Sequence, residues 1–189
     1  MEPSVRSQNR DRGLIQVYTG DGKGKTTAAI GLAVRAVGAG FRVAIVSFDK
    51  GGDHYSERRV LAERFKDEID LFATGLQRFD PAAKTFRFGA TPEDVAEAER
   101  GLRLAETILA GNKYDLVILD EVLTCIPFGL LRESDVLPVL SNKPRRTELA
   151  LTGRGCPESI IRLADLVSEI RCVKHYFGCG VGARAGLDH

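Results

Sequence analysis

Short apolar runs alternate with segments of helical character along most of the chain, and this alternation constrains the fold more than any other feature. The nearly continuous apolar runs are expected to form strands, at residues 14–18, 42–48, 69–73, 116–119, 148–151 and 167–173. Helical spacing and capping residues mark the segments at residues 26–39, 57–65, 92–110, 133–140 and 157–164. Strands with apolar residues on both faces are typical of parallel sheets that helices cover on both sides. The sequence therefore predicts an α/β fold: a three-layer parallel sheet with helices on both faces and right-handed crossovers.

The length of 189 residues suits one ordinary domain. We expect residues 13–189 to form a single domain and the polar residues 1–12 to form an N-terminal arm. No apolar run approaches the roughly 18 residues of a membrane span. The polar residues 1–13 also contain no hydrophobic signal core. The expected location is therefore the cytoplasm, with no membrane partner.

Charge and cysteine usage argue against several classes of protein. The net charge is +1, the pI is about 7.7, and no stripe of basic and aromatic residues runs along the chain. A nucleic-acid-binding module is therefore disfavoured, and any anion binding must be local. The cysteines are widely spaced, without a CxxC pair, at Cys125, Cys156, Cys172 and Cys179. This spacing argues against a zinc site or a disulfide framework, and we expect all four to be small buried residues.

A glycine-rich segment, GDGKGKTT, lies between the first expected strand and the first expected helix. In this context successive backbone N–H groups can converge on phosphate oxygens, and the start of the helix adds its positive dipole end. Lys25 supplies a charge to the phosphates, and Thr26 is the expected hydroxyl ligand of Mg²⁺. The predicted ATP-binding residues of this loop are Gly20, Asp21, Gly22, Lys23, Gly24, Lys25, Thr26 and Thr27.

The spacing of this loop departs from the usual GxxxxGK[ST] pattern. Five residues before Gly24 stands Thr19 rather than a glycine, so the loop is one residue short when it is counted from Gly20. The sequence therefore predicts a nonstandard pose of the nucleotide. The alternative is a plain glycine turn with solvated lysines.

Two further strand ends carry polar residues suited to a nucleotide site. The run LVIL at 116–119 leads into Asp120 and Glu121, which looks like a Walker B element. Either carboxylate can hold Mg²⁺, directly or through water, and we expect one of the two to be structural. The segment TGRGCP at 152–157 places Arg154 between two glycines, where it can reach a phosphate with two hydrogen bonds. Arg154 therefore joins the predicted ATP-binding residues.

Together these segments resemble the P-loop type of ATP:corrinoid adenosyltransferases, the cob(I)yrinic acid a,c-diamide or cob(I)alamin adenosyltransferase family. The resemblance runs from about Gly13 to the C-terminus and rests on residues 20–27, 119–121 and 152–156 and on the segment EIRCVKH at 169–175. It implies a transferase with a RecA-like P-loop NTPase fold. It also implies a homodimer that takes its electron from a donor such as a reduced flavoprotein.

The resemblance implies the reaction as well. A corrinoid reduced to Co(I) attacks the ribose 5′ carbon of ATP, which forms an adenosyl–cobalt bond and releases triphosphate. The nucleotide is bound in the reverse sense, with its γ-phosphate where other P-loops hold an inner phosphate. Lys25, Thr26 and Glu121 are then the catalytic residues that stabilise the leaving triphosphate. Mg²⁺ is held by Thr26, Glu121 and Asp120, and no general base is required because Co(I) is already a strong nucleophile.

By the same resemblance, the corrinoid lies near the residues that follow the ATG segment at 73–75. Leu76, Arg78 and Phe79 stand there, where the family usually has an aromatic pair. Lys50, at the end of the second expected strand, either lies near the nucleotide or the corrinoid or faces solvent.

A different reading of the same motifs is a conventional RecA-like P-loop ATPase or kinase. Such an enzyme transfers the γ-phosphate to water or to an acceptor hydroxyl, and Glu121 would be the base that activates the acceptor. An inactive carrier of a nucleotide or a corrinoid is a further alternative. The products formed from ATP distinguish these possibilities.

Overall fold

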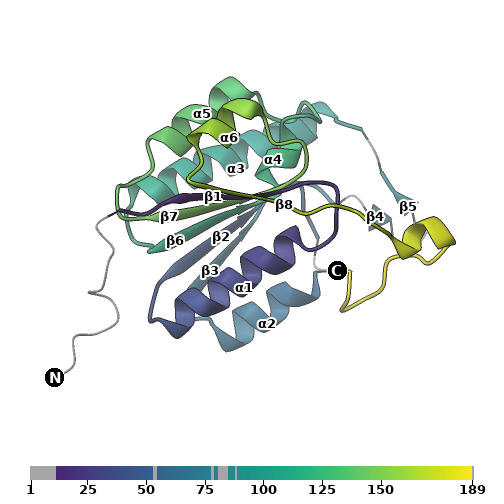
Figure 1. Ribbon diagram of the computed structural model, residues 1–189, viewed down its shortest axis with the longest axis horizontal. Coiled ribbons are helices and arrows are strands. Elements are labelled where there is room, and N and C mark those ends of the chain that lie inside the picture. The colour runs from purple at the N-terminus through teal and green to yellow at the C-terminus, as the bar shows by residue number, and fades with distance from the viewer. Residues whose placement is uncertain (1–11, 53–54, 78, 81–84, 88, 189) are drawn as a thin grey trace.

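The fold is built around a six-stranded sheet in which all neighbouring strands are parallel, in the order β3-β2-β6-β7-β1-β8 (Figure 1). The computed structural model describes residues 12–52, 55–77, 79–80, 85–87 and 89–188. The strands of the sheet are β1 (Ile15–Thr19), β2 (Val43–Ser47), β3 (Ile69–Ala73), β6 (Leu116–Asp120), β7 (Glu148–Thr152) and β8 (Leu166–Glu169). A separate antiparallel pair, which the apolar pattern did not predict, consists of β4 (Phe79–Asp80) and β5 (Thr85–Phe86).

Helices cover both faces of the sheet, as Figure 1 shows. One face carries α1 (Lys25–Gly38) and α2 (Ser56–Arg64). The other face carries α3 (Pro92–Ala110), α4 (Val122–Cys125), α5 (Glu133–Ser141) and α6 (Glu158–Leu163). A short 3₁₀ helix, η2 (Tyr176–Cys179), follows β8. Each face has its own cluster of buried apolar side chains. The predicted three-layer α/β fold is therefore confirmed, and it is consistent with a P-loop NTPase-like domain.

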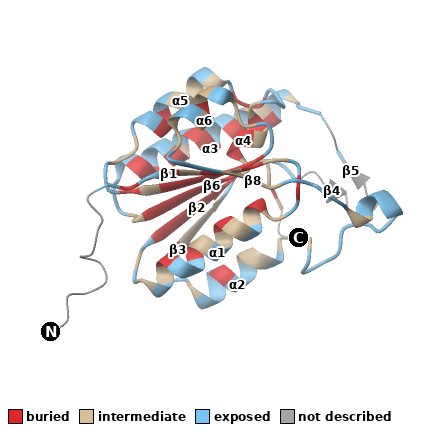
Figure 2. Cartoon of the chain, viewed as in Figure 1, coloured by how far each residue is buried: buried red, intermediate tan, exposed pale blue. Residues whose placement is uncertain are grey.

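The burial of each strand follows its position in the sheet (Figure 2). Every residue of β2 and β6 is buried, because these strands lie inside the sheet between two helical layers. The edge strands β3 and β8 are partly exposed. The prediction of a strand at 167–173 is wrong in its bounds, because β8 spans only Leu166–Glu169. Beyond that point the backbone runs alongside the loop after β1: the N–H of Ile170 donates to Thr19 O (2.8 Å) and Ile170 O accepts from the N–H of Gly22 (2.8 Å).

The longest helix, α3, begins where the sequence predicts. Thr91 is its N-cap and forms a capping box with Asp94, and Pro92 occupies the first turn. Asp94 is buried, and its carboxylate accepts two hydrogen bonds from the guanidinium of Arg87, at 2.6 and 2.7 Å. This pair fixes the chain that leads into α3. No helix among the described residues is long and apolar enough to cross a membrane.

The parallel arrangement brings several loops to one edge of the sheet. The loops after β1, β2, β6 and β7 all leave from the carboxyl ends of strands that lie side by side. In the register of the sheet, Ser47 is paired with Asp120 and Tyr18 with Thr152. Ligands of open α/β sheets bind at this edge, so the candidate site lies there.

Two helix glycines offer a matched test of this packing. Gly31 is exposed on α1, where a Cβ would meet nothing within 4 Å, so Gly31→Ala should stabilise the fold by about 0.5–1 kcal/mol. Gly101 is buried in α3, where a Cβ would lie 2.6 Å from Thr74 Oγ1 and 2.9 Å from Phe48 Cε1. Because both neighbours are buried, Gly101→Ala should destabilise the fold by about 1–3 kcal/mol. Urea unfolding of both variants measures the effects; a stabilised Gly101→Ala variant would contradict this packing.

Candidate phosphate and metal site

A cavity of about 820 Å³ opens at the carboxyl edge of the sheet. The glycine-rich loop and the start of α1 form one side of it, and Lys50 and Tyr55 contribute from the chain after β2. Glu121, Arg154 and part of the C-terminal segment complete the lining. This volume lies in the range of small-molecule sites, and the lining is rich in charge.

The backbone of the glycine-rich loop explains its glycines. Gly20 has φ +101°, and a Cβ there would lie 2.4 Å from Ile170 O. A Cβ on Gly22 would lie 2.7 Å from the carbonyl carbon of Arg171. Gly24 directly precedes α1 and has φ +121°, a conformation that other residues rarely adopt. Gly20 and Gly22 therefore allow the chain after β8 to pack closely against the loop. Gly24 provides the backbone conformation from which α1 begins.

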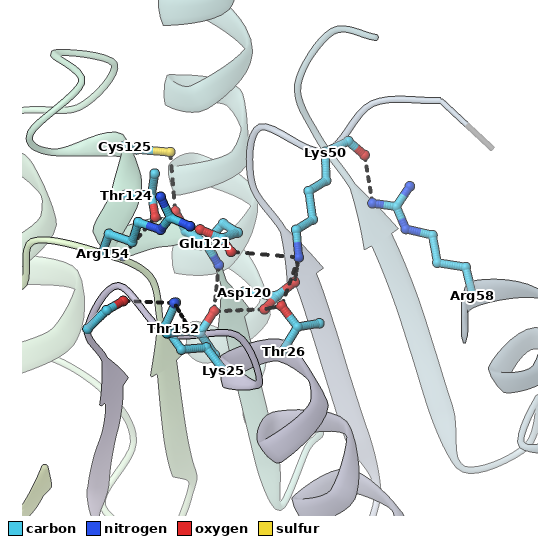
Figure 3. Close-up of polar contacts among 12 residues, drawn as sticks. Lys25, Thr26, Lys50, Arg58, Asp120, Glu121, Thr124, Cys125, Thr152 and Arg154 are labelled. Atoms are coloured by element: carbon cyan, nitrogen blue, oxygen red, sulfur yellow. Dashed lines mark hydrogen bonds and ion pairs between the residues drawn. The ribbon is translucent and has the colours of Figure 1, made fainter. Parts of the chain in front are cut away.

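Lys25 lies inside the loop that precedes it. Its Nζ donates to Gly20 O at 2.8 Å and to Gly22 O at 2.7 Å (Figure 3). The residue is buried, and this burial lowers the pKa of its ammonium. The charge of Lys25 is thus held at the centre of the loop, where phosphate oxygens are expected.

Asp21 and Lys23 have partners in the C-terminal segment. Asp21 Oδ1 accepts from the N–H of Cys172 at 3.1 Å. The ammonium of Lys23 donates to Leu187 O (2.6 Å), to the hydroxyl of Tyr176 (3.2 Å) and to the carboxylate of Asp188. Both residues line the cavity. Lys23, however, is exposed, whereas Lys25 is buried within the loop.

Three oxygen-bearing side chains meet around the ammonium of Lys50. Its Nζ lies 2.6 Å from Asp120 Oδ2, 2.9 Å from Thr26 Oγ1 and 3.9 Å from Glu121 Oε1 (Figure 3). Burial by itself would lower the pKa of Lys50, but the carboxylates of Asp120 and Glu121 outweigh it and raise the pKa. Hydroxyl and carboxylate oxygens suit Mg²⁺, and here they already surround a positive charge. The predicted metal ligands Thr26, Asp120 and Glu121 therefore fit a cation.

The two acidic residues at the end of β6 occupy different positions. Asp120 is buried, and its Oδ1 accepts hydrogen bonds from Thr26 Oγ1 (2.9 Å) and Thr152 Oγ1 (2.7 Å). Glu121 lines the cavity, and its carboxylate accepts from the hydroxyl of Thr124. Glu121 also has a left-handed backbone, with φ +64°, which is uncommon for a residue other than glycine.

As Figure 3 shows, Arg154 lies on the side of Glu121 that faces away from Lys50. Its backbone N–H donates to Thr124 Oγ1 at 2.9 Å, so Thr124 links the loop after β7 to Glu121 (Figure 3). Gly153 permits this contact, because a Cβ on it would lie 2.5 Å from the N atom of Thr124. The Arg154 residue is exposed and lines the cavity. The structure thus brings the three predicted strand-end motifs to one cavity.

A comparison with known proteins identifies the family. The family model for "ATP:corrinoid adenosyltransferase BtuR/CobO/CobP" matches residues 11–189. The chain belongs to this family. It is 38% identical over 189 residues to the corrinoid adenosyltransferase of Escherichia coli (strain K12) and to corrinoid adenosyltransferase CobA of Salmonella typhimurium (strain LT2). Each alignment covers 100% of this chain and 92% of the relative. The corrinoid adenosyltransferase of Pseudomonas aeruginosa is 33% identical over 188 residues, which cover 100% of this chain and 89% of that protein.

The residues predicted to face the corrinoid in this adenosyltransferase are placed only in part. Leu76 is 37% exposed and follows Gly75, whose backbone has φ +100° and packs against Asp49. Phe79 belongs to β4, where its backbone pairs with Phe86. Arg78 lies outside the described residues.

The position of Lys50 among the metal donors was left open by the sequence. Thr26 was predicted, but the roles of Thr124 and Thr152 beside the acidic pair were missed. Lys50 follows β2 closely, and the register pairs Ser47 of that strand with Asp120. Strand ends are visible in the sequence, but the order of the strands is not. Thr152, the hydroxyl-bearing residue of TGRG at the end of β7, was the one local signal for the buried polar contact with Asp120.

The expectation that all four cysteines of the adenosyltransferase are buried is wrong for Cys172 and Cys179, which are exposed. These two lie in the segment after β8, which packs over the loop rather than into the core. Cys125 is buried and Cys156 is half-buried. Burial, followed by the charges of Glu133 and Glu158, raises the pKa of the Cys156 thiol to about 11, so this thiol is protonated and unreactive at neutral pH.

Thiol titration tests this placement. At pH 8 the folded protein should react quickly at two thiols, Cys172 and Cys179, and at all four after unfolding in guanidinium. The Cys172→Ser/Cys179→Ser variant should lose the fast phase. A fast phase in that double variant would contradict the burial of Cys125 or the raised pKa of Cys156.

Thr124 offers a test of how the site is held together. Thr124→Val removes the hydroxyl that bonds Glu121 and the N–H of Arg154, whereas Thr124→Ser keeps it. Thr124→Val should weaken triphosphate binding about 10-fold or more, and Thr124→Ser should bind within about 3-fold of the wild type. Titration calorimetry with tripolyphosphate and Mg²⁺ measures both. Equal binding by the two variants would show that the hydroxyl does not position these groups.

Proposed function

We propose that this protein transfers the 5′-deoxyadenosyl group of ATP to the Co(I) of a corrinoid and releases triphosphate. Its membership of the corrinoid adenosyltransferases supports this reaction. The observation that carries the proposal is the convergence of Thr26, Asp120 and Glu121 on a positive charge beside the glycine-rich loop. A triphosphate and its metal ion need such a pairing of an anion-binding loop with oxygen ligands.

The leaving triphosphate is held by the loop, Lys25 and Arg154. The start of α1 and the backbone N–H groups of the loop, other than that of Gly22, which donates to Ile170 O, are proposed to face its oxygens. The Lys25 ammonium contributes its charge from within the loop. Thr26, Asp120 and Glu121 are the residues that would hold Mg²⁺. When bound, this ion neutralises phosphate charge. Binding of this kind stabilises the charge that develops as the bond to the 5′ carbon breaks.

The bond changes of this reaction need no proton transfer. Co(I) supplies the electron pair of the new cobalt–carbon bond, and the bond between the 5′ carbon and its oxygen breaks with its electrons moving to the triphosphate. A kinase or ATPase, by contrast, needs a free base at the γ-phosphate. Glu121 is poorly suited to that task, because one carboxylate oxygen accepts from Thr124 and the carboxylate is itself a proposed ligand of Mg²⁺. The site therefore favours adenosyl transfer over conventional γ-phosphate chemistry.

The corrinoid is proposed to bind beside the segment that follows Gly75, with Leu76, Arg78 and Phe79 as its proposed contacts. Gly51 supports this placement, because a Cβ on it would lie 2.4 Å from Gly75 O, so the loop after β3 is packed against the loop that carries Lys50. Leu76 is exposed next to this contact and can present an apolar surface to the corrin ring.

Further features follow from the same proposal. We propose that residues 13–189 act as a single domain of a homodimer and that a reduced flavoprotein or a similar donor supplies the electron. The proposed location is the cytoplasm, where the four free cysteines would stay reduced. The proposed partners include neither nucleic acid nor a membrane.

An anaerobic assay tests the reaction. The protein is incubated with chemically reduced corrinoid, Mg²⁺ and ATP, and the products are separated. We expect a light-sensitive adenosylcorrinoid and an equal amount of triphosphate. ADP and phosphate in place of triphosphate would overturn the proposal in favour of an ATPase.

Two lysine variants test the triphosphate site. Lys25→Ala removes the charge inside the loop and should lower kcat/KM at least about 100-fold, because this charge is needed most as the triphosphate leaves. Lys113→Ala removes an exposed lysine outside the lining of the cavity and should leave kcat/KM unchanged. Circular dichroism confirms that both are folded. A Lys25→Ala variant as active as the wild type would mean that the triphosphate binds elsewhere.

A further inference from the structure

The ammonium of Lys50 lies where the candidate metal ligands converge. It is within hydrogen-bonding distance of Asp120 Oδ2 (2.6 Å) and Thr26 Oγ1 (2.9 Å), and Glu121 Oε1 lies 3.9 Å away. Lys50 lies in the loop after β2, and Figure 3 shows its side chain reaching toward these oxygens. A second cation cannot take up the same oxygens while the ammonium is there, because like charges so close together repel strongly in a partly buried site.

We propose that Lys50 and the metal ion exchange places: when the metal ion binds Thr26, Asp120 and Glu121, the ammonium of Lys50 leaves these oxygens and binds the triphosphate. The identity of the phosphate ligand rests on the proposed function. The exchange at the metal site is independent of the proposed function, since it depends only on the oxygens that surround Lys50 in this structure.

The backbone of Lys50 is fixed, so the exchange moves only its side chain. The backbone N–H of Lys50 donates to Thr74 O at 3.1 Å, and its carbonyl oxygen accepts from Arg58 Nη2 at 2.6 Å. The guanidinium of Arg58 also donates to Gly52 O at 3.0 Å, which holds the following turn. A flexible four-carbon side chain on a fixed backbone can swing to a new partner without disturbing the sheet.

The cavity determines where the displaced ammonium goes. Lys50 lines the same cavity as Lys25, Thr26 and Arg154. Its Nζ also lies 5.7 Å from the ring centre of Tyr55, whose face attracts a cation. Once it has left Asp120, the ammonium remains in a cavity that then contains phosphate oxygens. Lys50 therefore becomes a second lysine, with Lys25, on the triphosphate.

Metal binding in the absence of nucleotide tests the exchange. Mn²⁺, which is detected directly by electron paramagnetic resonance, should bind the Lys50→Met protein at least about 10-fold more tightly than the wild type, because the competing charge is gone. The Lys113→Met protein should bind as the wild type does. The added substitution Glu121→Gln should weaken the binding gained in Lys50→Met, which assigns the gain to this site. Equal or weaker Mn²⁺ binding by Lys50→Met would overturn the exchange.

A second variant guards against misfolding of Lys50→Met, which leaves the buried carboxylate of Asp120 without its ammonium. Lys50→Gln keeps a hydrogen-bond donor but carries no charge, and it should show the same gain in Mn²⁺ affinity. Mg²⁺ should also raise the melting temperature of Lys50→Gln more than that of the wild type. Equal Mg²⁺ effects on the two proteins would overturn the exchange.

Binding of tripolyphosphate tests whether the ammonium of Lys50 contacts the triphosphate after it leaves Asp120. With saturating Mg²⁺, Lys50→Met and Lys50→Gln should bind tripolyphosphate at least about 10-fold more weakly than the wild type and Lys113→Met. Unchanged affinity would overturn the triphosphate contact. None of these measurements involves a corrinoid. A wild-type protein that shows the exchange but forms no adenosylcorrinoid would refute the proposed function alone.

Discussion

Three side chains from distant parts of the chain meet on the carboxylate of Asp120, and the rest of the site depends on this contact. Thr26 comes from the start of α1, Thr152 from the end of β7 and Lys50 from the loop after β2. A buried carboxylate is costly unless its oxygens are fully bonded. Asp120 meets this condition with two hydroxyls and an ammonium. The same bonds therefore stabilise a buried charge and fix the start of the helix that follows the glycine-rich loop.

The sheet makes this meeting possible, and the glycines let the loops close around it. With all strands parallel, the ends of β1, β2, β6 and β7 lie at one edge, so short loops suffice to bring their residues together. Gly20 and Gly22 allow the chain after β8 to pack closely against the loop, and Gly153 allows the backbone of Thr124 to do the same. Each contact excludes a Cβ, so the high glycine content is a consequence of close packing between loops as well as of phosphate binding.

The sequence was sufficient for features that depend on neighbours along the chain. The strand, loop and helix around 20–27, the acidic end of β6 and the capped start of α3 follow from local patterns, and the structure contains all three. Features that depend on the order of the strands in the sheet could not be predicted from local patterns. Lys50 meets Asp120 because β2 lies next to β6 in register, which no local pattern reports. The extent of β8 and the exposure of Cys172 and Cys179 were mispredicted for a related reason, since apolar residues do not reveal whether a partner strand continues beside them.

The charges of the site explain how a chain of net charge +1 can handle a highly anionic group. Lys23 and Lys50 are paired with carboxylates, whereas Lys25 donates to backbone carbonyls. A cavity lined in this way presents less free positive charge than its lysine content suggests. If a metal ion replaces Lys50 at Asp120, both the ion and the released ammonium act on the triphosphate. The stabilising charge would then be greatest when the substrate and its metal are both bound, which is when the bond to the 5′ carbon breaks.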